Sequence, residues 1–112
     1  MRFFSFGELI PLLLIAAAAA AGFTVYQELP DRVPTHWGVS GGTDGWSDRV
    51  SFVWWFPGFI LFIYLVLTFI PLIDPRRDNI MAAAREYFIL RTAFVIFLCV
   101  LYIAILSVAL GF

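Results

Sequence analysis

The sequence predicts an all-α integral membrane protein. It would have three transmembrane helices and a structured, Gly/Pro-rich extracytoplasmic loop between the first two. Of the 112 residues, 62% are hydrophobic, which exceeds the apolar share of ordinary soluble domains. Only 13% are charged, and the mean hydropathy is +0.95. The apolar residues form three runs, each long enough for a bilayer crossing of about 20 residues. We therefore expect a single membrane domain over residues 1–112.

The first expected span covers about residues 7–26 and includes the small-residue run Ala16–Gly22. Small residues let membrane helices approach closely, so this run is a candidate surface for a protein partner or for self-association. The alternative interpretation is a secretory signal peptide that begins at the basic Arg2. Glu8 interrupts such a peptide early, and the apolar run continues past the alanines. Both features favour a retained transmembrane helix.

The second and third expected spans cover about residues 52–73 and 87–110. Asp74 before Pro75 is a preferred helix start, with the aspartate as the N-cap and the proline at the first helical position. No helix breaker follows before Gly111. We therefore expect the third helix to begin near residue 75 in the cytoplasm and to run unbroken into the membrane.

The arginines predict the orientation, because short cytoplasmic loops are enriched in basic residues. The side with the N-terminus and the second connection carries Arg2, Arg76, Arg77 and Arg85, whereas the loop side carries Arg32 and Arg49. We expect a multi-pass protein of the cell (inner) membrane, with a cytoplasmic N-terminus. Loop 27–51 and the C-terminus would be extracytoplasmic. Tryptophans favour the headgroup layer, and those on the loop side predict that the loop lies against the membrane surface: Trp37, Trp46, Trp54 and Trp55.

The loop also holds the only histidine of the chain, His36, among acidic residues. The spacing of His36, Asp44 and Asp48 matches no zinc or calcium pattern, and no nucleophile signature accompanies them. We assign no catalytic residue, metal ion or cofactor. We expect His36 to hydrogen-bond across the loop, Asp44 to cap a turn, and Asp48 to lie at the water interface before the second helix. The net charge of -1 leaves no basic face for nucleic acid.

Two ionisable residues fall near the inner edge of the predicted hydrocarbon region, Glu8 in the first span and Arg91 in the third. Ionisable groups there are costly unless they pair. Glu8 and Arg91 are therefore a candidate intramembrane pair that sets the register of the helices. The alternative is that each side chain extends separately to the headgroups.

The stretches "ELPDRVPTHWGVSGGTDGWSDR" and "PLIDPRRDNI" resemble the SdpI family of bacterial membrane immunity and signalling proteins. The similarity is to the family's N-terminal membrane module, a domain of unknown function, here truncated to three spans. The full-length immunity protein continues with a further membrane half. The resemblance implies an extracytoplasmic loop with these signature residues: Pro30, Pro34, His36, Trp37, Gly42, Asp44 and Asp48.

This resemblance implies immunity to a secreted peptide, or envelope sensing, through the outer loop. The alternative function is an accessory or assembly subunit of a larger membrane complex, which small size and the alanine-rich helix favour. A membrane enzyme ranks third, since it would rest on His36 and the loop acids alone. A transporter ranks fourth, because no charged residue lies at mid-membrane.

Overall fold

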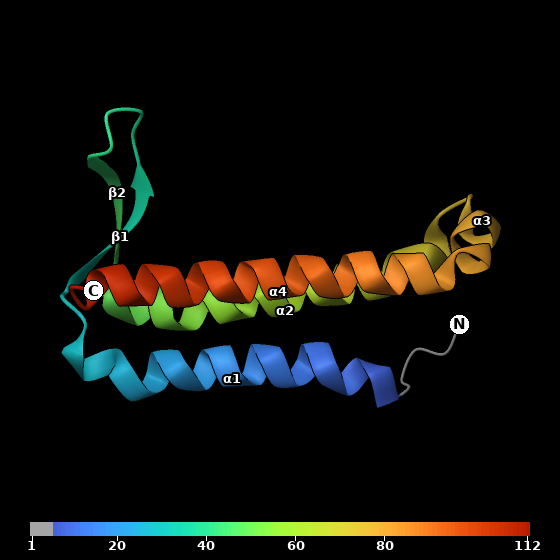
Figure 1. Cartoon of the computed structure of the whole chain (residues 1–112), viewed down its shortest axis with the longest axis horizontal. Coiled ribbons are helices and arrows are strands. Elements are labelled where there is room, and N and C mark those ends of the chain that lie inside the picture. The colour runs from blue at the N-terminus through green and yellow to red at the C-terminus, as the bar shows by residue number, and fades with distance from the viewer. Residues whose placement is uncertain (1–5) are drawn as a thin grey trace.

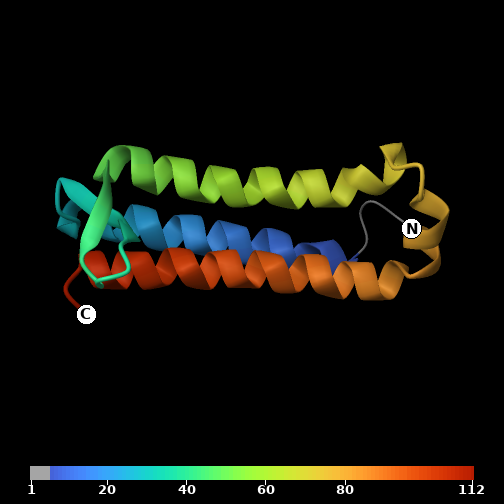
Figure 2. The same cartoon turned by 90° about the horizontal axis from the view of Figure 1, so that it is seen from above.

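The computed structural model describes residues 6–112 and consists mainly of a bundle of three long helices (Figure 1). They are α1 (Leu9–Val25), α2 (Arg49–Ile73) and α4 (Ala84–Ala109). Successive long helices run antiparallel, and each contacts the other two (Figure 2). The shorter elements are η1 (Phe6–Glu8), η2 (Tyr26–Glu28), β1 (Arg32–Trp37), β2 (Thr43–Asp48) and α3 (Arg77–Ala82). Figure 1 places the two strands at one end of the bundle, the hairpin end, and α3 at the other, the α3 end.

All three long helices are long and apolar enough to cross a membrane, as the sequence predicts. Their sides carry large exposed hydrophobic residues, among them Leu13, Phe62 and Leu90. This is consistent with contact between the bundle and a lipid bilayer. The core lies between the helices and continues under the strands, where Val33 and Leu29 are buried. The bundle is therefore apolar both inside and out, which makes its few polar contacts informative.

One such contact compensates for a proline inside α2. Pro57 has no N–H and cannot donate to the carbonyl of Val53, four residues earlier in the helix. The Tyr102 hydroxyl of α4 donates to that carbonyl at 3.4 Å. Membrane helices tolerate proline when a neighbouring helix satisfies the freed backbone group in this way. On the other side of the hydroxyl lies Gly22 of α1, so all three helices meet here.

The second proline within α2 follows the same pattern at the α3 end. Pro71 leaves the carbonyl of Leu67 without its helical donor, and the Tyr87 hydroxyl of α4 donates to that carbonyl. Two tyrosines of α4 thus replace the two hydrogen bonds that prolines remove from α2. The hydroxyl positions link the register of α4 to that of α2.

The expectation of an all-α chain is wrong for the loop, which contains a two-stranded antiparallel sheet of β1 and β2. The register pairs Val33 with Ser47 and Pro34 with Trp46, and then shifts by a bulge. Both strands of a two-stranded sheet are edges, where proline is tolerated. Gly41 turns the chain between them with a φ of 88°. The glycines and prolines of the predicted loop therefore belong to a hairpin.

The prediction of one unbroken helix from near Pro75 is also wrong, because α3 and α4 are separated at Ala83. Arg91 of α4 donates to Thr68 of α2. If α4 ran straight back from Arg91, residue 75 would lie roughly 24 Å from the contact between Arg91 and Thr68. Along α2, Ile73 lies only about 8 Å from the same contact. Two peptide links span about 7 Å. The chain must therefore fold back, and α3 does so (Figure 1).

Asp74, predicted as the N-cap of the third helix, instead caps the end of α2. Its carboxylate accepts a hydrogen bond from the backbone N–H of Arg76 at 2.8 Å, and α3 begins one residue later. That hydrogen bond, followed by one from the Arg76 side chain, lowers the pKa of Asp74 from its ordinary value. The residue therefore shapes the turn between the helices instead of starting the next one.

The close approach of α1 and α4 predicts that Gly22→Ala destabilises the bundle. A Cβ at residue 22 would lie 2.0 Å from the buried Tyr102 hydroxyl oxygen, and overpacking of this kind costs about 1–3 kcal/mol of unfolding free energy. Thermal unfolding in detergent should show a lower midpoint, and adding Tyr102→Phe should recover part of it. Gly58→Ala is the control, because nothing lies within 4 Å of a Cβ there. Equal melting of the two alanine variants would contradict the prediction.

Candidate functional site

The polar side chains of the structure gather in two places, an ion-pair cluster inside the bundle and the hairpin at the opposite end. Glu8 and Arg91, the candidate pair of the sequence, face each other between α1 and α4. The Arg91 Nη2 atom lies 2.7 Å from Glu8 Oε1 and 2.8 Å from Oε2. The two residues are only 5% and 3% exposed. They therefore form a buried ion pair, and neither extends separately to the headgroups.

α2 completes this cluster with two polar residues. The Tyr64 hydroxyl donates to Glu8 Oε1 at 2.5 Å, and the Thr68 hydroxyl accepts from Arg91 Nη1 at 3.1 Å. Thr68 also donates to the Tyr64 carbonyl within its own helix at 2.7 Å. Sequence reasoning missed both residues. Their spacing of four, which puts two polar groups on one face of an aromatic helix, is the signal that indicates them.

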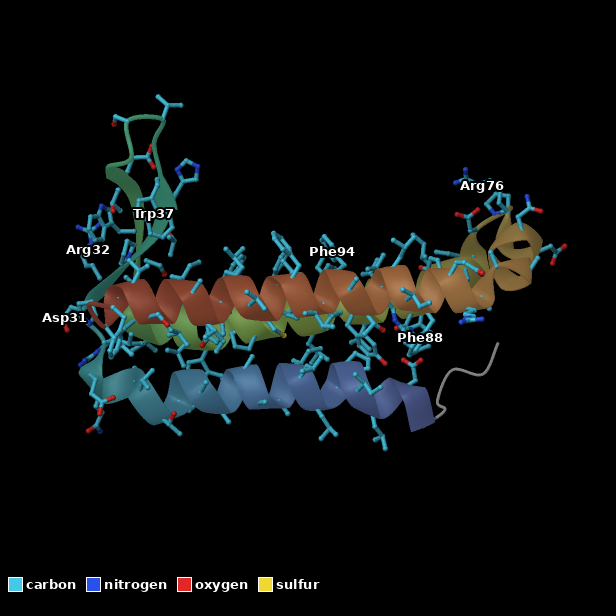
Figure 3. All side chains as sticks on the ribbon, in the orientation of Figure 1. Asp31, Arg32, Trp37, Arg76, Phe88 and Phe94 are labelled. Carbon is cyan, nitrogen blue, oxygen red and sulfur yellow. The ribbon has the colours of Figure 1, made fainter. Side chains whose placement is uncertain are left out.

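Aromatic rings surround the guanidinium group of Arg91. It lies 5.0 Å from the ring centre of Tyr64 and 4.9 Å from that of Phe88, within the range of cation–π attraction. Figure 3 shows Phe88 in the space between α4 and the start of α1. Within residues 6–112, Arg91 Nε and Thr92 Oγ1 are buried without a hydrogen-bond partner. The cluster thus neutralises the charges but leaves one guanidinium donor unpaired.

At the hairpin end, His36 and Asp44 contact each other through Nδ1 and Oδ1. The histidine is on β1 and the aspartate on β2, so the predicted hydrogen bond across the loop is present. Asp44 was expected to cap a turn, but its carboxylate bonds the imidazole instead. Gly45 gives the histidine room, since a Cβ there would lie 2.8 Å from that of His36. The two side chains are 73% and 53% exposed, which leaves the pair open to a ligand.

Arg49 fixes the base of the hairpin to the bundle, a role that the sequence does not indicate. Its backbone N–H donates to the Asp31 carbonyl at 3.0 Å, and its Nη1 donates to the Leu29 carbonyl at 3.1 Å. Its guanidinium lies 5.0 Å from the ring centre of Tyr26. These contacts join the end of α1, the start of β1 and the start of α2. The hairpin is therefore held at its base.

Asp48 ends the hairpin and begins α2. Its carboxylate accepts the backbone N–H of Ser51 at 3.0 Å, as an N-cap does. This bond, followed by one from the Ser51 side chain, lowers the pKa of Asp48 from its ordinary value. The cap explains why α2 begins three residues before the predicted span. It also fixes where β2 ends relative to the bundle.

The other signature residues of the loop also belong to the hairpin or its entry. Pro30 is exposed before β1, and Trp37 at the end of β1 is 37% exposed. The Gly42 carbonyl accepts from the Gly38 N–H at 2.9 Å and closes the turn. Figure 3 shows Trp37 above the base of the hairpin, where Asp31 and Arg32 lie. Trp46, Trp54 and Trp55 are also exposed at this end.

Within residues 6–112, no three His, Cys, Asp or Glu side chains come together as a metal-binding group would require. Arg2, which enters both the orientation argument and the signal-peptide alternative, lies outside the described residues.

The hairpin, with its exposed His36–Asp44 pair, is also the part of the chain that a known family shares. Residues 13–61 match the model of a family described as a domain of unknown function (DUF1648). The match takes in most of α1, the whole hairpin and the first half of α2, which is less than half of the chain. The Glu8–Arg91 pair and its partners on α2 lie outside it. No curated protein and no solved structure matches the chain.

The ion pair predicts that Arg91→Leu is more damaging than removal of both charges. Arg91→Leu leaves Glu8 buried without its counter-charge, and breaking a buried pair in this way costs about 3–5 kcal/mol of unfolding free energy. Glu8→Gln with Arg91→Leu leaves no charge, and the amide oxygen still accepts from Tyr64. In detergent, the double variant should therefore have a larger free energy of unfolding than Arg91→Leu alone. A double variant no more stable than Arg91→Leu would contradict the pairing.

Proposed function

We propose that the chain is a small multi-pass membrane protein of the SdpI type. Its extracytoplasmic hairpin recognises a ligand at the membrane surface, in immunity to a membrane-active peptide or in envelope sensing. The observation that carries the proposal is the exposed His36–Asp44 pair on a hairpin that projects from the bundle (Figure 1). An imidazole can donate or accept hydrogen bonds and the carboxylate beside it accepts them, and recognition of a peptide requires both donors and acceptors.

The division of polar groups supports this assignment. Glu8 and Arg91 satisfy each other inside the bundle, and burial closes them to a soluble ligand. The groups of the hairpin are exposed, and the DUF1648 match includes all of them. A recognition role for the hairpin and a structural role for the bundle account for both facts. The orientation with the hairpin outside rests on the arginine distribution.

We expect bacteria that express the protein to survive higher concentrations of a membrane-active peptide than bacteria that lack it. His36→Ala and Asp44→Ala should each abolish this protection, because each removes half of the exposed pair. The readout is the minimal inhibitory concentration across a panel of such peptides, with membrane levels of each variant matched by immunoblot. Asp78→Ala is the control, since Asp78 is an exposed aspartate at the opposite end. Equal killing with and without the protein across the panel would refute the immunity function.

A second candidate function is an accessory subunit of a larger membrane complex. A groove of about 430 Å³ between α1 and α4 favours it, because small side chains line part of its wall, among them Ala17, Ala18 and Ala104. Such a wall would let another helix approach closely, either from a partner or from a second copy. Purification in mild detergent separates the two candidates. A stoichiometric partner supports the accessory role, and a clean monomer contradicts it.

A further inference from the structure

A groove lies between the hairpin and the first turns of α2. Its volume is about 490 Å³, and it is lined by Thr35, Ser47, Ser51, Phe52, Trp55 and Phe56. The hairpin residues contribute one wall and α2 the other. Figures 1 and 2 show the hairpin extending crosswise to the helices at their end, so the groove lies where the bundle meets the hairpin.

The groove combines hydroxyl and aromatic side chains, and none of its lining residues is charged. Thr35 and Ser47 are on the hairpin wall, whereas Ser51 lies with the three aromatic residues on the α2 wall. Within the described part of the chain, no hydrogen bond is made by the Thr35 hydroxyl, whereas the Ser47 hydroxyl makes one of 3.2 Å to the Asp48 carbonyl. The groove therefore offers at least one free hydroxyl donor beside an aromatic surface. That combination suits an uncharged, amphipathic segment of a ligand.

A second depression continues the groove along α2. It is lined by Trp54, Trp55, Gly58, Phe59 and Phe62 and has a volume of about 360 Å³. Trp55 belongs to both depressions and stacks on Phe59, with ring centres 5.2 Å apart and planes 7° apart. Gly58 has no side chain, and nothing lies within 4 Å of the position that a Cβ would take there. The surface between the rings is therefore low. From Ser51 to Phe62 this path runs roughly 16 Å along the helix.

If α2 crosses a bilayer, the path begins at the membrane boundary and descends into the membrane. Ser51 is in the first turn of α2, which is apolar enough to cross a bilayer from Arg49 to Pro71. Trp54 and Trp55 follow it and are 68% and 61% exposed, as is usual for tryptophans at the interface. A phospholipid presents uncharged ester oxygens at this level and an acyl chain below it. The path has the same order as a phospholipid, with hydroxyl side chains at the hairpin and aromatic rings farther along α2.

We propose that this path is a binding site for one phospholipid. A glycerol ester oxygen accepts a hydrogen bond from the Thr35 hydroxyl under the hairpin. One acyl chain follows Trp55, Gly58 and Phe59 down the side of α2. Because the lining residues carry no charge, the site holds the ester region and the chain and does not select the headgroup. His36 and Asp44 do not line the path, so this site is independent of the proposed recognition function.

The test uses the full chain in nanodiscs that contain a photoreactive phospholipid with a diazirine in its acyl chain. Cross-linked peptides are mapped by mass spectrometry. We expect labelling to concentrate on residues 54–62 of α2, along which the acyl chain runs. Thr35→Phe fills the groove and Gly58→Leu blocks the path below it, so each should reduce this labelling several-fold. Ser40→Phe at the exposed turn and Ala93→Leu on the exposed face of α4 are the matched controls, and both should label as the wild type does.

Three outcomes would overturn the assignment. Labelling spread evenly around the helices and unchanged by Gly58→Leu would show an ordinary lipid-facing surface. A several-fold preference for phosphatidylglycerol over phosphatidylcholine with the same reactive chain would contradict a site that ignores the headgroup. Displacement of wild-type labelling by a synthetic amphipathic peptide, but not by excess unlabelled phospholipid, would assign the groove to a peptide instead. Thermal unfolding of each variant confirms that a loss of labelling does not reflect a loss of fold.

Discussion

Two opposite charges meet inside an apolar bundle, and that contact constrains where each of the three long helices lies. Glu8 at the start of α1 and Arg91 in α4 are both almost fully buried, and α2 adds the Tyr64 hydroxyl to the same carboxylate. Neither charge is stable alone in such surroundings, so α1 and α4 are confined to registers that bring them together. Near the hairpin end, the Tyr102 hydroxyl donates to the Val53 carbonyl of α2 and lies beside Gly22 of α1. All three helices therefore meet around a polar side chain toward each end of the bundle.

The sequence predicts the parts of this fold that depend on hydrophobicity and charge. The three spans follow from apolar run length, and the Glu8–Arg91 pair follows from the cost of isolated ions. A hydrogen bond from His36 across its loop is also predicted, but Asp44 as its partner is not. The break at Ala83 does not follow, because nothing in the local sequence opposes a helix there. It is required only once the contact between Thr68 and Arg91 sets the register of α4 against α2. The β-hairpin was missed because glycine and proline favour both irregular turns and edge strands.

The contacts of the hairpin explain how a short polar segment keeps a defined position beside a bundle. Asp48 caps α2 where β2 ends, and Arg49 joins the hairpin base to the end of α1. Val33 is fully buried against the bundle, so one face of the sheet is fixed while the His36–Asp44 pair stays exposed. This arrangement leaves the groove open beneath the hairpin. The family match covers this half of the molecule and not the ion pair.

The central claim is that Glu8 and Arg91 are in direct contact in the membrane. Solid-state NMR on bilayer samples tests it, with ¹⁵N in the arginine side chains and ¹³C in the glutamate carboxyl groups. Among the side chains that the structure describes, the other arginine ion pairs are to aspartates, Asp31 and Asp74, so an Arg–Glu dipolar coupling reports on this pair. The account predicts one strong coupling between a guanidinium nitrogen and a carboxylate carbon, and Glu8→Gln should remove it. The absence of such a coupling in the wild-type chain, or its persistence in Glu8→Gln, would contradict the account.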